Sequence, residues 1–154
     1  MKKYAFFLLL TTILFSLTGC QNECYYHSKS IYLDVAQSEW KFDTDQQQFY
    51  AHFNLNQITS DIFNYGNYTL HREYNTNTKD VYQVGLPQSL YLWENVTEAD
   101  GSEVTVYYQQ LVDYRVGVGY VEIQVTNSDY FYPEDASGNK INPEAMVFHL
   151  QLIY

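Results

Sequence analysis

Seven segments of the chain have the pattern of β-strands. Most of them alternate between apolar and polar residues with a period of two, while residues 89–95 are apolar on both faces. This alternation is typical of a β-strand that turns one face to a core and the other to water. The segments are residues 30–36, 49–55, 68–74, 89–95, 103–110, 120–126 and 147–154. Because each short strand must bury its apolar face, the sequence predicts an all-β fold: a single antiparallel immunoglobulin-like β-sandwich of about seven strands. A closed barrel is the alternative that the pattern leaves open.

The aromatic content indicates the same fold class. The chain has 17 Tyr, 9 Phe and 2 Trp, residue types that favour pleated, half-buried surfaces. Arg72 interrupts one alternation by lying on the apolar side, so we expect it near an edge of its sheet. Between the second and third segments, Thr59 or Ser60 can cap a short helical turn that Gly66 ends.

The first 19 residues have the pattern of a secretory signal peptide. Lys2 and Lys3 precede an uncharged run at residues 5–17, and small residues follow it. The run is shorter than the roughly 20 residues that a membrane-spanning helix needs. We therefore expect residues 1–19 to be removed on export.

The end of this run resembles a bacterial lipobox. Residues 17–20 read LTGC, and in a lipobox the cysteine thiol takes a diacylglycerol before the signal is cleaved. Cys20 is thus the predicted lipidation site, with secretion of an unmodified chain as the alternative. Residues 20–29 would form the tether and residues 30–154 the β-sandwich domain. Cys24 then has no partner in its own chain and either stays a free thiol or pairs with another chain.

Acidic residues dominate the charge of the chain. The net charge is −10, and it becomes −12 when Lys2 and Lys3 leave with the signal peptide. The remaining basic residues are scattered along the sequence. An acidic surface repels phosphate groups, so nucleic acid is excluded as a partner and the membrane is expected to be reached through the lipid anchor.

The sequence lacks the usual motifs of catalysis. It has no G-x-S-x-G nucleophile elbow. The stretch GVGYVE at 117–122 begins like a dinucleotide fingerprint, but Glu122 stands where a third glycine would be needed. A hairpin turn with a positive φ is the favoured interpretation. We predict a protein that is not an enzyme and binds no cofactor.

Two groups of residues contain possible metal ligands. A zinc site would need His52 and His71 on neighbouring strands, together with nearby carboxylates. A calcium site would use the loop at 128–144, which lacks the ligand spacing of an EF-hand. Its oxygen ligands are Asp129, Glu134, Asp135 and Asn139. Solvated strand faces and a solvated turn explain both groups better, so no metal is predicted.

The chain has more aromatic residues than one small core needs. Flat rings exposed on a sheet or loop can stack on sugar rings or anchor a protein partner. The candidate ligand-contact residues are Tyr91, Trp93, Tyr107, Tyr130 and Tyr132. The alternative is that these rings serve core and edge packing.

The order of several segments resembles small Bacteroidetes-type cell-envelope lipoproteins of uncharacterised function. The resemblance is carried by residues 49–66, GLPQS at 85–89, residues 116–129 and the terminal FHLQLIY. It implies an immunoglobulin-like sandwich lipid-anchored to the outer membrane, periplasmic or surface-exposed, with no catalytic residues. The expected function is a non-catalytic binding or accessory module for a glycan or protein ligand. The alternative is a structural subunit of a fimbria-like or other surface assembly.

Overall fold

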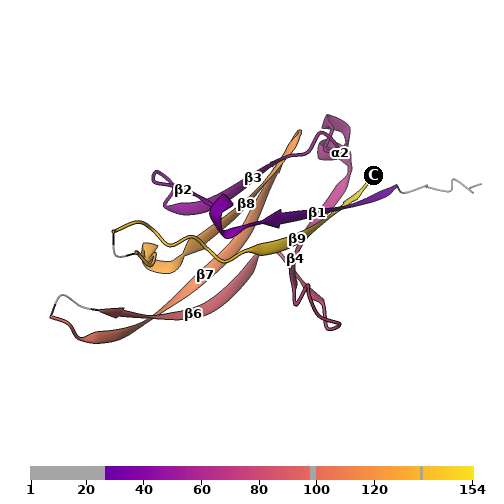
Figure 1. Ribbon diagram of the computed structural model, residues 1–154. Helices are drawn as coiled ribbons and strands as arrows, with labels where there is room; N and C mark the ends of the chain where they lie inside the picture. The colour runs from indigo at the N-terminus through magenta and orange to yellow at the C-terminus, as the bar shows by residue number, and fades with distance from the viewer. Residues whose placement is uncertain (1–26, 98–99, 136) are drawn as a thin grey trace, which may run out of the picture.

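The strands form two separate antiparallel sheets (Figure 1). The computed structural model describes residues 27–97, 100–135 and 137–154. One sheet has the order β1 (Ser28–Val35), β9 (Met146–Ile153), β4 (Asn67–Tyr74) and β5 (Tyr82–Gly85). The other has the order β2 (Lys41–Asp43), β3 (Gln48–Asn54), β8 (Tyr120–Asn127), β7 (Glu103–Gly117) and β6 (Gln88–Thr97). The predicted all-β antiparallel sandwich is confirmed.

All seven predicted strands are present, and two short ones join them. The additions are β2, with three residues, and β5, with four. Neither is long enough to produce a recognisable alternation, which is why the sequence pattern missed them. β1 begins at Ser28, two residues before the predicted start of the domain. β7 continues to Gly117, well past its predicted end at residue 110.

The core lies between the inner faces of the two sheets. Phe148, Leu150 and Leu152 of β9 are fully buried, and Val121 and Ile123 of β8 face them from the other sheet. These residues sit two apart along their strands, as the alternation predicted. Burying such side chains is worth about 1.5–3 kcal/mol each, so this layer is the main source of stability.

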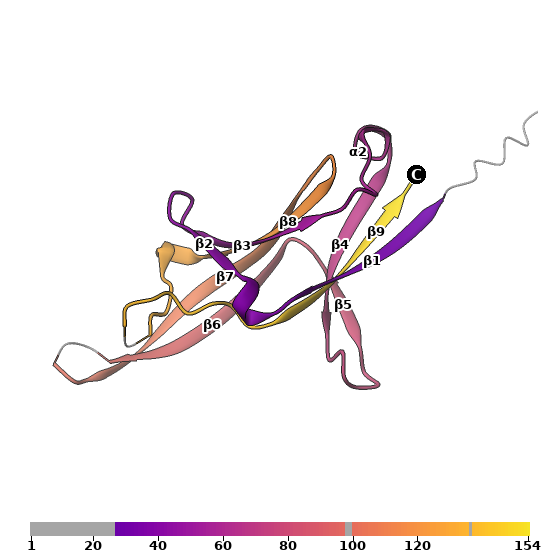
Figure 2. The same ribbon diagram turned by 45° about the horizontal axis from the view of Figure 1, so that its top comes forward.

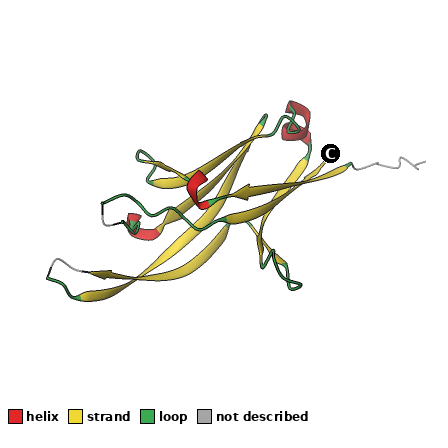
Figure 3. Cartoon of the chain, viewed as in Figure 1, coloured by secondary structure: helices red, strands yellow, loops and turns green. Residues whose placement is uncertain are grey.

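Three short helices complete the described chain (Figure 3). They are η1 (Gln37–Glu39), α2 (Ser60–Tyr65) and η2 (Ser128–Tyr130). Thr59 caps α2, since its side-chain oxygen accepts a hydrogen bond from the Ile62 N–H at 3.3 Å. Gly66 is the C-cap of the helix, where the chain becomes extended and the Gly66 N–H donates to the Ile62 carbonyl oxygen. Only glycine fits there, because a Cβ would lie 2.6 Å from that oxygen. The predicted helical turn and its cap are confirmed.

The GVGYVE stretch forms the predicted hairpin turn. β7 ends at Gly117 and β8 begins at Tyr120, which leaves a two-residue connection. Gly119 has a φ of 83°, a conformation that glycine adopts without steric cost. The turn therefore explains Gly119, whereas at Gly117 a Cβ would collide with the Tyr120 ring.

Arg72 corrects one expectation about the sheet. It lies on β4, between β5 and β9 rather than at an edge, and only 4% of the residue is exposed. Its guanidinium group forms an ion pair with Glu144 and lies 4.5 Å from the centre of the Tyr74 ring. A charged side chain is tolerated inside the sheet because a counter-ion and an aromatic face replace part of its hydration.

β6 and the outer half of β7 project past the end of the four-stranded sheet (Figures 1 and 2). The segment between η2 and β9 lies over the inner side of this projection. Tyr108 of β7 and Phe131 of that segment touch, with ring centres 5.2 Å apart. The hairpin thus has one face toward this segment and one face toward solvent.

Candidate functional site

The outward side of the β6–β7 hairpin carries a cluster of exposed rings. Tyr91 and Trp93 lie on β6, and Tyr107 lies on β7; we call these three residues the outer aromatic face. Their exposed fractions are 86%, 65% and 79%. Single exposed aromatic residues are normal, but three on one sheet face indicate an interaction surface.

The strand register brings the three rings together. Trp93 lies directly opposite Tyr107, and Tyr91 lies two residues along the same strand. Directly opposite Cβ atoms in an antiparallel pair are about 4.5–5.5 Å apart. Residues two apart on a strand are separated by about 6.5–7 Å. The register therefore places the three rings in one strip on the outward face of the hairpin, which twists along its length (Figures 1 and 2).

Amide and hydroxyl groups border the strip at both ends. At one end Thr105 donates its hydroxyl hydrogen to the Asn95 side-chain oxygen at 2.8 Å. At the other end the Gln109 amide donates to the Ser89 hydroxyl. Both pairs are exposed and keep further donors and acceptors available. Apolar rings flanked by neutral hydrogen-bonding groups suit a ligand that is itself part apolar and part hydroxylated.

These polar neighbours were absent from the sequence-based prediction. Three polar residues are an even number of positions from the aromatic residues on their strands and so lie on the same face: Asn95, Thr105 and Gln109. This spacing was visible in the sequence. The cross-strand pairing was not, because it depends on the register between β6 and β7.

Tyr130 is exposed but lies apart from this strip. It ends η2 and lines a hollow on the inner side of the hairpin, together with Thr97 and Glu134. Its exposed fraction is 67%. It remains available to a ligand on that inner side.

Tyr132 corrects the expectation of an exposed ring, because it is buried. Only 4% of it is exposed. Its ring meets Phe42 and Phe49 edge-on, with ring centres 5.0 Å and 5.6 Å away. Its hydroxyl donates to the Gln47 carbonyl oxygen and accepts from the Asn127 N–H at 3.2 Å. Burial raises the pKa of Tyr132 above its ordinary value. This ring anchors the segment that follows η2.

The inner side of the hairpin is hollowed. Two hollows of about 260 Å³ and about 780 Å³ lie next to each other here, because both have Glu94 and Pro133 in their walls. Leu92 and Tyr108 line the apolar part of the smaller hollow. Burial, and secondarily the negative charge of Glu94, raises the pKa of the Tyr108 hydroxyl. Tyr108 therefore stays neutral and available as a hydrogen-bond donor well above neutral pH.

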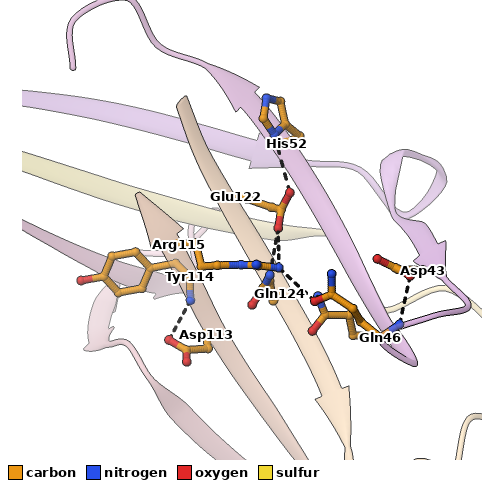
Figure 4. A network of polar contacts seen from close by, with 9 residues as sticks. Asp43, Gln46, His52, Asp113, Tyr114, Arg115, Glu122 and Gln124 are labelled. Carbon is orange, nitrogen blue, oxygen red and sulfur yellow. Dashed lines mark hydrogen bonds and ion pairs between the residues drawn. The ribbon is translucent and has the colours of Figure 1, made fainter. Parts of the chain in front are cut away.

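A row of polar and charged residues crosses the solvent face of the five-stranded sheet (Figure 4). His52, Glu122 and Arg115 lie side by side on β3, β8 and β7. The Glu122 carboxylate is 3.7 Å from His52 Nδ1 and 3.1 Å from Arg115 Nη2. It also accepts a hydrogen bond from the Gln124 amide at 2.8 Å. Glu122 is thus fully engaged by its neighbours, and the row acts as cross-strand stabilisation.

Neither group of candidate metal ligands is arranged as a metal site in the described part of the chain. β3 and β4 belong to different sheets, so His52 and His71 are not on neighbouring strands. In the loop, Asp135 accepts hydrogen bonds from the backbone N–H groups of Ser137 and Asn139. These bonds lower the pKa of Asp135. Within the described ranges no group of three His, Cys, Asp or Glu residues is placed to hold a metal ion.

The N-terminal predictions fall on residues that the structure does not describe. The signal peptide at 1–19, Cys20 and Cys24 all lie outside the described ranges. Among the helices that are described, none has the length and apolar character needed to cross a membrane. Lipidation at Cys20 stays a prediction from the sequence.

Comparisons with known proteins returned no match to a family model, to a curated protein or to a solved structure. The resemblance to cell-envelope lipoproteins therefore stays a prediction carried by the sequence segments.

Proposed function

We propose that this protein is a non-catalytic binding module of the cell envelope that holds a glycan on its outer aromatic face. The observation that carries the proposal is the strip formed by Tyr91, Trp93 and Tyr107, which is exposed and bordered by amide and hydroxyl groups. Sugar rings have apolar C–H faces that stack on aromatic rings, and hydroxyl rims that bond to neutral polar groups. A neutral ligand also suits a chain with a net charge of −10.

Tryptophan fluorescence tests this proposal directly. The chain has two tryptophans: Trp40 is buried, whereas Trp93 is exposed. A glycan that stacks on the strip should shift the Trp93 emission to the blue and protect it from a soluble quencher. Screening an array of neutral oligosaccharides, followed by titration of the best binder, gives the affinity.

Substitution of Trp93 by Ala should weaken glycan binding about tenfold, since an aromatic contact of this kind is worth about 0.5–1.5 kcal/mol beyond its buried area. The matched control is Tyr65→Ala, which removes an exposed ring from α2. Equal effects of the two substitutions, or no binder in the whole array, would refute the glycan proposal.

The location belongs to the same proposal. A lipid on Cys20 would hold the domain at the outer membrane, because two or three acyl chains anchor a protein firmly. We expect the full chain to partition into the detergent phase and Cys20→Ser to move to the aqueous phase. Cys24→Ser is the control and should behave like the unaltered chain. Aqueous partition of the unaltered chain would contradict the anchor.

One observation favours the structural-subunit alternative. β6 is a ten-residue strand at the edge of its sheet, and such an edge can accept a strand from another molecule. A fimbria-like subunit would form long open polymers, whereas a binding module would not. Electron microscopy of the purified full chain distinguishes the two.

A further inference from the structure

β6 is the last strand of the five-stranded sheet, and its outer edge is the place on this fold where another strand could pair. β7 is the only strand that pairs with β6 among the described residues. Outside the strand ladders, residues 88–97 make no backbone hydrogen bond to any other described residue. Half of the backbone groups of this ten-residue strand therefore face outward without a partner in the part of the chain that the structure describes.

The other three edge strands of the two sheets are better protected. Residues 103–109 of β7 also lack a β8 partner, but η2 lies at the end of that stretch, where the Gln109 N–H donates to the Ser128 hydroxyl. β2 and β5 are short, with three and four residues. β1 is longer but carries Lys29 and Asp34. Short edges and charged edge residues are the usual defences against strand pairing. β6 has no Pro, Lys or Arg, and Glu94 is its single charge.

The sequence of β6 is complementary to itself when two copies run antiparallel. Pairing centred on Leu92 sets Leu92 opposite its counterpart, and sets Tyr91 opposite Trp93 of the second copy. The Tyr91–Trp93 pair then occurs twice on the outward side, because the arrangement has two-fold symmetry. Aromatic pairs in directly opposite positions are among the favourable cross-strand contacts.

Charge selects this register over a neighbouring one. With Leu92 at the centre, Glu94 lies opposite Leu90 of the second copy. A register centred on Glu94 would set two carboxylates against each other, which is unfavourable. Antiparallel pairing also sends the acidic residues at the hairpin end, such as Asp100 and Glu103, to opposite ends of the joined sheet.

We propose that two copies of this chain join edge to edge through β6, with Leu92 at the two-fold axis, into one continuous ten-stranded sheet. Nine paired residues from each copy, 88 to 96, would exchange about eight to ten backbone hydrogen bonds. That number equals the roughly ten direct hydrogen bonds of a typical protein interface. The dimer extends the proposed function without depending on it, since it would merge two outer aromatic faces into one longer strip.

The oligomeric state of the full chain tests the pairing. Sedimentation or native mass spectrometry should show a dimer at about 100 μM, a concentration at which a micromolar complex is formed. Leu92→Lys and Leu92→Glu each place like charges opposite one another at the axis and should raise the dissociation constant at least about tenfold. An equimolar mixture of the two variants should form heterodimers again, with opposite charges at the same position.

Tyr107→Lys is the matched control, because it puts the same charge on the same hairpin one strand away from the edge. It should leave the dimer intact while weakening glycan binding, so the failure of one proposal can be told from the failure of the other. A monomeric unaltered chain, an open series of higher oligomers, or folded Leu92 variants whose dissociation constants equal that of the unaltered chain would overturn the pairing. Circular dichroism establishes that the variants are folded.

Discussion

Tyr132 offers the sharpest test of how the segment between η2 and β9 is held. The ring packs edge-on against Phe42 and Phe49, and the hydroxyl bridges the Gln47 carbonyl oxygen and the Asn127 N–H. Replacing Tyr132 by Phe removes the bridge and keeps the ring. Replacing it by Ala removes both. The pair of variants therefore separates the two contributions.

The expected losses follow from these contacts. Without the hydroxyl, a carbonyl and an N–H are left without that partner in a buried place, which costs about 1–3 kcal/mol. Truncating a buried aromatic ring to Ala costs about 3–5 kcal/mol in all. We expect Tyr132→Phe to lower the free energy of unfolding by about 1.5 kcal/mol and Tyr132→Ala by about 4 kcal/mol.

Equilibrium unfolding in urea measures both values. With a slope of about 1.5 kcal/mol per molar urea, Tyr132→Phe should lower the midpoint by about 1 M with the slope unchanged. Tyr130→Phe, two residues earlier on an exposed ring, should change the free energy by less than about 0.5 kcal/mol. Equal stability of Tyr132→Phe and the unaltered chain would refute the bridging role, and equal stability of the Phe and Ala variants would refute the packing role.

Two further predictions concern buried polar groups. Glu144→Gln should destabilise the fold by about 1–3 kcal/mol, because it leaves the buried Arg72 guanidinium without its counter-ion. Arg72→Met should lower the free energy of unfolding by less, since the remaining Glu144 carboxylate is largely exposed. Urea unfolding in which Arg72→Met is the less stable of the two variants would contradict this. Burial raises the pKa values of Tyr108, Tyr114 and Tyr132 above the ordinary 10.0. The folded state then keeps protons that the unfolded chain releases, so this contribution to stability is complete below pH 10 and is lost as pH rises through the raised pKa values. Unfolding free energies measured from about pH 8 to 11 should fall at the alkaline end, less steeply for Tyr132→Phe, and a flat profile would count against the burial of these hydroxyls.

The sequence alone was sufficient for the seven longer strands and their buried faces, although it missed β2, β5 and the second half of β7. The alternation of Val121, Ile123 and Val125 predicted both β8 and the side of it that is buried. Thr59 and Gly66 likewise marked the ends of α2. These features are local, because the period of a strand and the cap of a helix depend on residues only a few positions apart.

The tertiary structure decided which of the aromatic residues are available to a ligand. Tyr130 and Tyr132 are two residues apart in the same segment, yet one is exposed and the other is buried. Tyr132 is buried because the chain folds back onto Phe42 and Phe49, more than 80 positions earlier. No pattern within the segment itself distinguishes the two residues.

The same reason applies to Arg72, the outer aromatic face and the edge of β6. Arg72 is balanced by a residue 72 positions away. Trp93 meets Tyr107 through a register set by the whole hairpin. β6 is an edge strand because of the order in which five strands assemble. Alternation within a strand is fixed by its own residues, but neighbours, register and edges depend on contacts between distant segments, and these exist only in the folded chain.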